Sequence, residues 1–471
     1  MAEIDFRTTP LADLALSVRA KEVSARELTE AALERIEALN PLYNAFVAVD
    51  GERALHAAAG IDERIVGGGD PGPLAGIPLG VKDLQNAVGF RTTFGSALHA
   101  EDPPATLDDP FVARMRAAGC VIVGKTNTPE FGWMGNTTNA IFGPSLNPFD
   151  TSRGPGGSSG GASAALAAGM VPLATGSDGG GSIRIPSACC GLSGMKPSLG
   201  RVPAGGPNPP GWVDLSTNGP MARRIADVAR ALDVAVGPDP TDLRALPRPE
   251  ASWLAALDDP HVPVRVAYAP TLGYATVDAE VAAACEHAVA VIEALGAEVV
   301  VLDSVFAADP VADFLTVTGA ATLRTLRPFM GHPRWEEVHP VLRHFVDAAQ
   351  ATTAEQLLQA FDRFHLMNLR LVELFRTARI LVTPTCSGLA PSAGEMTSSV
   401  NGETTANWIQ FTYPFNMTRS PAATVPVGLG GGGLPIGLQL IGPQHGDLVV
   451  LRTAAALEAA MDLDVVAALP N

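Results

Sequence analysis

The chain has 471 residues, of which 47% are hydrophobic and 17% are charged, a composition that predicts a globular protein with a large core. Its formal net charge of −17 argues against nonspecific binding to nucleic acid and against docking on anionic lipid. No basic region followed by an apolar core opens the chain, so we expect no signal peptide. The alanine-rich stretch from 162 to 175 is too short and too interrupted to span a bilayer.

The cysteines are odd in number and contain no C-x-x-C pair, so we expect free thiols in a reducing cytoplasm and no zinc site. They are Cys120, Cys189, Cys190, Cys285 and Cys386. A second group of candidate metal ligands, His332, Glu336 and His339, is bracketed by prolines, and we interpret it as a solvated turn.

In the first part of the chain, residues 8–40 are predicted to form helices. A capping box of Ser24 and Glu27 opens the second helix, and Asn40-Pro41 is expected to end it. Residues 76–84 are predicted to form a buried strand that ends in Lys82-Asp83, residues 110–118 a helix and residues 120–123 another strand. Strand, helix and strand in succession indicate an α/β fold.

Farther along the chain, two clusters of glycine and serine flank a helix-forming segment between 153 and 182. Residues 237–375 are rich in helix, and we interpret them partly as core and partly as an insertion over a pocket. Strands are predicted at 380–382, 423–427 and 436–441, and a closing helix at 447–461. No linker of useful length separates a second domain.

The run GSDGGGSIRIPS, residues 176–187, contains three successive glycines before Ser182. Such a turn presents successive N–H groups as an anion-binding nest. A serine at its end could attack a carbonyl carbon while the nest holds the oxygen, which is the arrangement that acyl transfer requires. Upstream, RGPGGSSGGASAA places Ser158 and Ser159 at the start of a helix.

A serine nucleophile needs a base, and Lys82 is the best candidate. It ends an apolar strand, and burial there would lower its pKa far enough to make the neutral amine accessible near pH 7. The alternative is a surface lysine paired with Asp83 or with another carboxylate. None of the histidines lies in a motif that places it near these serines, although His445 in GPQHGD is the most plausible of them.

Other motifs favour different functions. Residues 119–126 match a phosphate-binding loop, but the central residues are strand-like. Residues 157–161 match GxSxG, which would make the chain an α/β-hydrolase esterase with Ser159 as nucleophile, but this leaves Lys82 and the triple glycine unexplained. A non-enzymatic protein that binds an anion in the glycine turns is a third alternative.

GVKD, GGSSGG and GSDGGGSIRIPS occur in an order that resembles the amidase signature family. GMKPSLGR, YPFNMTRSPAATVP and GLPIGLQLIGP are also similar to that family, and the resemblance extends from about residue 8 to 460, weakly between 240 and 375. It implies one α/β domain over residues 1–471, with a central mixed sheet covered by helices on both faces. The variable region at 240–375 would then cover the substrate pocket.

The resemblance implies a Ser-cisSer-Lys amide hydrolase that works through a seryl acyl-enzyme and needs no cofactor or metal. Ser182 matches the nucleophile, Ser158 the serine after a cis peptide bond and Lys82 the base. The backbone N–H groups of Gly179, Gly180, Gly181 and Ser182 match the oxyanion donors. Asp178 and Arg184 resemble the pair that supports the glycine turn.

The chain departs from the family pattern at Ser177 and Gly179, where many members have threonines, and the extra glycine predicts a roomier site. The family also includes a glutamine-dependent amidotransferase A-type subunit. That branch usually has glutamine where this chain has Ile185, so a stand-alone hydrolase is favoured.

The substrate is expected to be a small apolar aryl or alkyl amide, and esters or carbamates would pass through the same kind of intermediate. The residues that we predict to line its pocket are Gly132, Trp133, Met134, Trp408 and Phe411. As partners we expect a small-molecule amide, with a homodimer as one option, and neither nucleic acid nor a membrane. The expected location is the cytoplasm.

Overall fold

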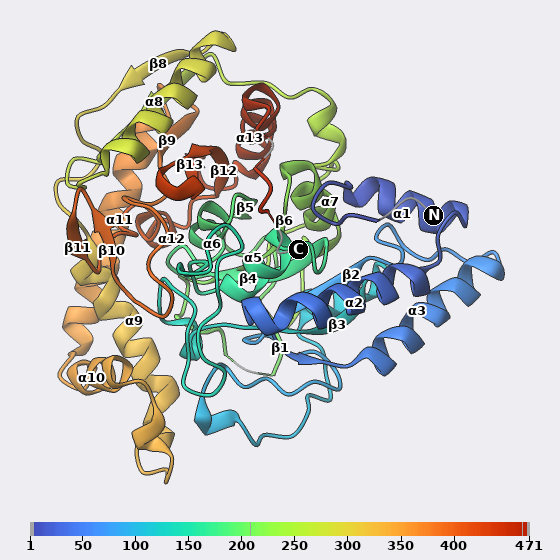
Figure 1. Ribbon diagram of the computed structural model, residues 1–471. Coiled ribbons are helices and arrows are strands. Elements are labelled where there is room, and N and C mark those ends of the chain that lie inside the picture. Colours follow the sequence, from blue (N-terminus) through green and yellow to red (C-terminus); the bar gives the residue numbers. More distant parts are fainter. Residues whose placement is uncertain (1–3, 208, 464, 469–471) are drawn as a thin grey trace.

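The computed structural model describes residues 4–207, 209–463 and 465–468. Its strands are β1 (Phe46–Val49), β2 (Pro78–Lys82), β3 (Val121–Thr126), β4 (Leu173–Asp178), β5 (Ser193–Lys196), β6 (Thr217–Ala222), β7 (Arg265–Tyr268), β8 (Glu298–Val301), β9 (Ile380–Pro384), β10 (Ser398–Val400), β11 (Glu403–Thr405), β12 (Ala422–Leu429) and β13 (Pro435–Ile441). All but β10 and β11 join one 11-stranded sheet, in the order β1-β3-β2-β4-β6-β5-β12-β13-β9-β7-β8 (Figure 1). β10 and β11 pair separately.

The sheet is mixed, with parallel pairing on either side of an antiparallel centre. β2 is parallel to both β3 and β4, and β7 is parallel to both β8 and β9. Between these groups the strands from β4 through β6, β5, β12 and β13 to β9 pair antiparallel. Because β2 and β4 run in the same direction, their carboxyl ends lie at the same edge of the sheet.

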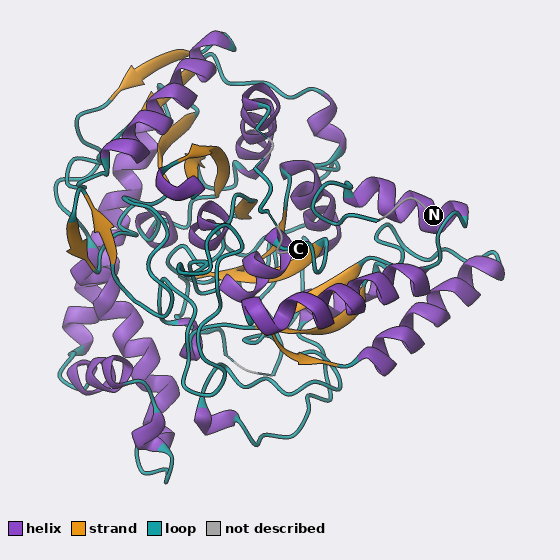
Figure 2. Ribbon diagram, in the orientation of Figure 1, coloured by secondary structure: helices purple, strands orange, loops and turns teal. Residues whose placement is uncertain are grey.

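Helices pack on both faces of this sheet, as Figure 2 shows. The α-helices are α1 (Leu11–Ala20), α2 (Ala25–Tyr43), α3 (Gly51–Val66), α4 (Pro110–Ala117), α5 (Gly160–Ala167), α6 (Arg184–Cys189), α7 (Ile225–Ala235), α8 (Ala279–Ala294), α9 (Val311–Leu326), α10 (Pro340–Ala349), α11 (Ala354–Leu374), α12 (Pro414–Met417) and α13 (Asp447–Met461). The 3₁₀ turns are η1 (Ala97–His99), η2 (Glu130–Gly132), η3 (Ala255–Asp258), η4 (Arg327–Phe329), η5 (Trp335–Glu337) and η6 (Gly431–Gly433). The predicted α/β fold with a single mixed sheet is confirmed.

Every residue of α5 and of α6 is buried, which explains why these two helices consist largely of small residues. α5 packs on β4 and β2, whereas α6 packs on β13, β5 and β12. Both helices begin directly after a glycine-serine motif. The apolar packing of the helices therefore holds the two motifs in place at the edge of the sheet.

Most elements predicted from the pattern are present, and the closing helix has the predicted bounds. The capping box of Ser24 and Glu27 is formed at the start of α2. The prediction that Asn40-Pro41 ends α2 is wrong, because the helix continues to Tyr43. Pro41 lies in the last turn, and Asn44 ends the helix in a left-handed conformation with its N–H bonded to the Asn40 carbonyl at 2.8 Å.

Residues 240–375 contribute both to the sheet and to a separate group of helices. β7 and β8 complete one end of the sheet. α9 and α10 lie at the lower left of Figure 1 with α11 above them, and α9 packs on both α10 and α11. Within the described part of the chain, no helix is long and apolar enough to cross a membrane.

Candidate active site

Lys82, Ser158, Ser159, Ser177 and Ser182 lie together where β2 and β4 end, and we call them the Ser–Lys cluster. The buried Lys82 Nζ lies 2.8 Å from Ser158 Oγ, 2.8 Å from Ser159 Oγ and 3.1 Å from Ser177 Oγ. The Ser159 N–H donates to the Ser182 carbonyl at 3.2 Å, which ties the two glycine-serine motifs together. The cluster thus brings together all three residues that the resemblance implies for catalysis.

Burial lowers the pKa of Lys82 from its ordinary value to about 7, while the nearby negative charge of Asp178 raises it. Near neutral pH a large fraction of this amine is therefore unprotonated. The alternative pairing of Lys82 with Asp83 is not formed. Asp83 is paired with Lys125 on the neighbouring strand β3, at 3.0 Å, and both of these side chains are buried.

Ser158 follows a cis peptide bond to Gly157. Backbone atoms of Asn136 and Met134 would lie 2.8 Å from any Cβ at position 157, so only glycine fits there. Gly132, with a φ of 70°, approaches from the other side, and a Cβ on it would lie 3.2 Å from Ser158 Oγ. A side chain at position 132 would therefore crowd the Ser158 hydroxyl.

Asp178 and Arg184 form a fully buried ion pair at the two ends of the glycine turn. Arg184 Nε donates to Asp178 Oδ2 at 2.9 Å, and Arg184 Nη2 donates to Oδ1 at 2.8 Å. Asn416 Nδ2 donates to the same carboxylate at 2.9 Å. Burial alone would raise the pKa of Asp178, but the charge and hydrogen bonds of Arg184 hold that pKa below its ordinary value.

The glycine turn presents N–H groups toward the site, with one difference from expectation. The Gly181 N–H donates to Asp178 Oδ1 at 2.8 Å, so it is not available to a substrate oxygen. Gly181 has a φ of 129°, a conformation that points its N–H back to the carboxylate at the end of β4. Among the residues that the structure describes, no acceptor takes the N–H of Gly179, Gly180 or Ser182.

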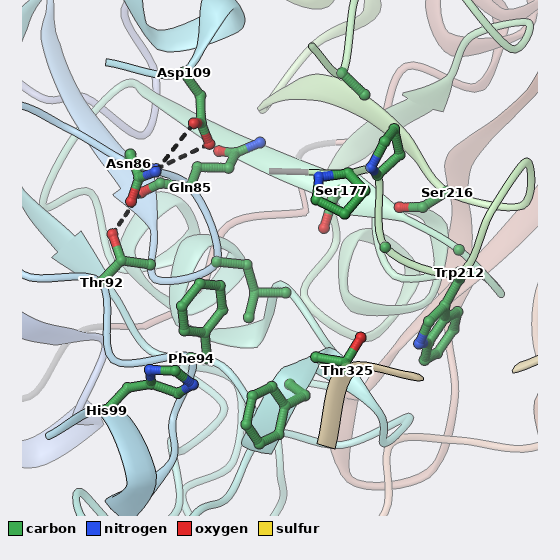
Figure 3. A pocket seen from close by; sticks show the side chains of 18 of the residues that line it. Gln85, Asn86, Thr92, Phe94, His99, Asp109, Ser177, Trp212, Ser216 and Thr325 are labelled. Atoms are coloured by element: carbon green, nitrogen blue, oxygen red, sulfur yellow. Dashed lines mark hydrogen bonds between the residues drawn. The ribbon is translucent and has the colours of Figure 1, made fainter. Parts of the chain in front are cut away.

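Ser182, Ser158, Ser177 and Gly179 line one cavity, with a volume of about 660 Å³. Figure 3 shows a close view of this cavity, with Ser177 among the labelled side chains. Ser182 is 8% exposed, which is enough for its hydroxyl to reach this space. Ser159 is fully buried and is not among the lining residues. The nucleophile-elbow alternative would require Ser159 to meet the substrate, and its position argues against that.

A model of the amidase family matches residues 27–451. The chain is 38% identical to an acylamidase of Rhodococcus erythropolis, over 98% of this chain and 97% of the relative. It is 34% identical to the A-type subunit of the glutamyl-tRNA(Gln) amidotransferase of Thiobacillus denitrificans, over 94% and 95%. The crystal structure of a bacterial aryl acylamidase superposes with a TM-score of 0.92 at 30% identity, covering 99% of this chain and all of the other.

The chain belongs to the amidase family. It is an amide hydrolase, acting on carbon–nitrogen bonds other than peptide bonds. A second structural relative, 6-aminohexanoate cyclic dimer hydrolase with its substrate, has a TM-score of 0.88 at 29% identity over 98% of each chain. The match to the amidotransferase does not favour the transamidase alternative over hydrolysis.

Of the residues predicted to line the amidase's pocket, only Gly132 lines the cavity. Trp133 packs on Phe345, with 4.3 Å between the ring centroids. Trp408 is fully buried and donates its indole N–H to the Met396 carbonyl, Phe411 lies in the core, and Met134 is buried. These four side chains fill space between elements, which an aromatic residue near a motif does as readily as it lines a pocket.

The aromatic wall of the cavity consists of Phe94, His99, Phe131 and Phe329, and Phe131 directly precedes the predicted Gly132. The His99 ring packs against all three phenylalanines, with centroid distances of 5.0 Å to Phe94, 5.8 Å to Phe131 and 5.1 Å to Phe329. The four residues come from three separate stretches of the chain. No motif or spacing joins those stretches, so no sequence signal would have assembled them.

The prediction that the extra glycine at 179 makes the site roomier is wrong. Trp212 occupies the space that a side chain would take, since a Cβ on Gly179 would lie 2.6 Å from the Trp212 indole. Trp212 also lines the cavity. Ser177 was noted only as a departure from the family, yet its hydroxyl contributes a hydrogen bond to Lys82.

Proposed function

We propose that this amidase hydrolyses small amides through a seryl acyl-enzyme, with Ser182 as nucleophile, Ser158 as proton relay and Lys82 as base. The observation that carries the proposal is the buried contact of Lys82 Nζ with Ser158 Oγ, at 2.8 Å. A lysine with a pKa of about 7 can accept a proton at neutral pH and return it within one catalytic cycle.

In the acylation step, Ser182 Oγ attacks the amide carbonyl carbon. Its proton passes to Ser158 Oγ as the Ser158 proton passes to Lys82 Nζ. The carbonyl oxygen becomes an oxyanion, and the N–H groups of Gly179, Gly180 and Ser182 are free to stabilise it. The negative charge of Asp178 favours the ammonium form of Lys82 while the intermediate exists.

The tetrahedral intermediate collapses when the carbon–nitrogen bond breaks. The leaving amine takes a proton from Ser158, which is reprotonated by the Lys82 ammonium. Water then attacks the Ser182 ester, with the same two residues moving its proton, and the carboxylic acid leaves. The sequence of steps consumes one water and regenerates neutral Lys82.

We propose that the preferred substrates carry a small apolar aryl or alkyl group, which packs on the aromatic wall. A cavity of about 660 Å³ is in the range that holds a small organic ligand. The names of the related acylamidase and aryl acylamidase agree with this substrate class. Residues 240–375 would cover the substrate, and Thr322, Leu326 and Phe329 from α9 and η4 line the cavity.

Two expectations about the setting of the enzyme stay proposals. All of its cysteines are free and buried, which suits a reducing cytoplasm. A homodimer stays a prediction.

A serine-reactive phosphonate tests the mechanism most directly. After incubation with the enzyme, mass spectrometry of the digested protein should place the adduct on Ser182. A panel of anilides, primary amides, esters and carbamates, assayed in buffer alone, should include good anilide substrates, and added glutamine should not compete. An adduct on Ser159 would instead support the esterase alternative, and glutamine deamidation with inert anilides would support the amidotransferase.

A further inference from the structure

The substrate cavity has two chemically different ends. Opposite the aromatic wall lies a polar recess, formed by Gln85, Asn86, Asp109 and Asn218. In Figure 3, Asp109, Asn86 and Gln85 lie together in the upper part of the view, and His99 and Thr325 lie below them. A substrate that spans the cavity would therefore place different groups at its two ends.

Asp109 is the only carboxylate of the recess among its lining residues. It directly precedes α4, at the position where aspartate normally caps a helix, yet its side chain makes no capping hydrogen bond. Its oxygens accept instead from the Asn86 backbone N–H, at 3.0 Å, and from Asn86 Nδ2, at 3.2 Å. A carboxylate offers about four acceptor positions, so this one retains capacity for a ligand.

Among the residues that the structure describes, no lysine, arginine or histidine forms an ion pair with Asp109. Lys125, whose charge acts on Asp109, is held by Asp83 at 3.0 Å, and the adjacent Asp108 is paired with Arg116 at 2.7 Å. Asp83, Lys125 and Asp109 together therefore carry a formal net charge of about −1, because one lysine faces two carboxylates. The pKa of Asp109 is raised above its ordinary value, chiefly by burial and in smaller part by the charge of Asp108, which the Asn86 hydrogen bonds and Lys125 only partly offset. A positively charged ligand would therefore relieve the cost of keeping this carboxylate ionised.

The other charged groups that line the cavity do not compete for this role. Asp102 is bound to His99 Nδ1 at 2.7 Å, at the aromatic end. Arg324 is exposed and donates to the Pro210 carbonyl at 3.0 Å. Of the lining carboxylates, Asp109 is thus the one without a basic side chain as a hydrogen-bond partner.

We propose that the polar recess selects amides whose far end carries a primary ammonium group, with Asp109 as its counter-ion. The inference rests on the proposed function, because it names the substrates of the same cavity. An ammonium group would donate to Asp109, and the acceptor oxygen of Asn86 or Asn218 could take a second of its hydrogens. A carboxylate at that end would be repelled, and a methyl group would leave the recess unfilled.

Substrate pairs of equal length test the proposal. One series has acyl chains that end in ammonium, methyl or carboxylate on a common aniline, and a second series carries the same end groups on the amine half. In one of the two series, at the chain length that reaches the recess, kcat/KM should favour ammonium over methyl by about tenfold to a hundredfold, mainly through KM. Carboxylate should be the poorest of the three.

The variants are compared by the ratio of kcat/KM for the ammonium substrate to kcat/KM for the methyl substrate. A loss of activity that affects both substrates equally leaves this ratio unchanged. Asp109→Asn should reduce the ratio to about one, and Asp109→Ser, which retains a residue suited to the start of a helix, should do the same. Asp102→Asn removes a carboxylate from the other end of the cavity and should retain the ratio. The proposal is overturned if neither series prefers ammonium, or if the preference survives in both Asp109 variants.

A binding measurement separates this proposal from the catalytic one. Calorimetry with hexylammonium and Ser182→Ala requires no turnover, and binding should weaken about tenfold or more when Asp109→Asn is added. Hexylammonium that binds both proteins equally would overturn the recess proposal, even if every neutral anilide is hydrolysed. If the neutral anilides are inert while this binding difference is present, the proposed function fails and the recess stands.

Discussion

The Ser–Lys cluster and the aromatic wall face the same cavity, but different forces hold them in place. The cluster lies at the ends of two parallel strands and is fixed by buried hydrogen bonds and by the Asp178–Arg184 ion pair. The wall is held by ring contacts between Phe94, His99, Phe131 and Phe329, which come from distant stretches of the chain.

This difference indicates that the cluster determines the chemical step and that the wall determines substrate binding. Hydrogen bonds constrain distance and direction, so displacing any member of the cluster should affect the chemical step and therefore kcat. Ring packing tolerates small shifts, so changes in the wall should act mainly on binding and therefore on KM. Substitutions in the two regions can test whether they are separable in this way.

The largest expected effect is that of Ser182→Ala. Without the nucleophile, kcat/KM should fall about 10⁴-fold or more, while the fold is retained because the hydroxyl lies at the cavity surface. Rates on an anilide and a thermal melt of the same preparation measure both. Ser159→Ala is the matched control, since that variant should still be labelled by the phosphonate on Ser182. A Ser182→Ala enzyme with substantial activity would contradict the assignment.

Lys82→Met should follow, with a loss of about 10²- to 10⁴-fold, the range that a general base contributes. Since the lysine must be neutral to accept a proton, wild-type activity should rise with pH and level off above about 7, the pKa of Lys82. The variant should lack this rise. kcat/KM measured between pH 5 and 9 gives the comparison.

Lys125→Met provides the control, because Lys125 is an equally buried lysine on the adjacent strand but is paired with Asp83. It should lose stability and retain the shape of the pH profile. If the rise with pH is lost in Lys125→Met but kept in Lys82→Met, the titrating group is Lys125 and the assignment to Lys82 is wrong.

The Ser–Lys cluster could be predicted from the sequence better than the aromatic wall, because local motifs place its residues. Lys82, Ser158 and Ser182 stand in short motifs whose neighbours, a buried strand end and two glycine turns, are local features. The closing helix from Asp447 to Met461 could be predicted because its pattern is also local. Phe329 and Phe131 become neighbours of His99 only through packing across the whole fold, and the more conspicuous Trp408 and Phe411 belong to the core.

Asp178 and Arg184 support the cluster but do not line the cavity. Replacing either residue should therefore lower the stability of the fold before it affects substrate binding. Arg184→Met leaves a buried carboxylate without its counter-charge and should lower the free energy of unfolding by about 3–5 kcal/mol. Urea denaturation measures this. Arg26→Met, which breaks an exposed pair with Glu30, should cost less than about 0.5 kcal/mol. Equal losses in the two variants would show that the buried pair has no special role.

The smallest expected effect concerns a contact beside the Ser–Lys cluster, where Gly179 of the glycine turn meets Trp212, which also lines the cavity. Gly179→Ala places a methyl group 2.6 Å from the indole, and this overpacking should lower the free energy of unfolding by about 1–3 kcal/mol. Because the glycine turn is displaced, kcat/KM should also fall about tenfold. Trp212→Ala alone enlarges the cavity and should act mainly on KM. In the double variant the methyl group has space, so part of the loss should be recovered, with a coupling of about 1 kcal/mol. Gly211→Ala, which meets no neighbouring atom, controls for the added methyl. Strictly additive effects would mean that Gly179 and Trp212 do not interact, whereas the expected coupling would show that the indole limits the space beside the glycine turn.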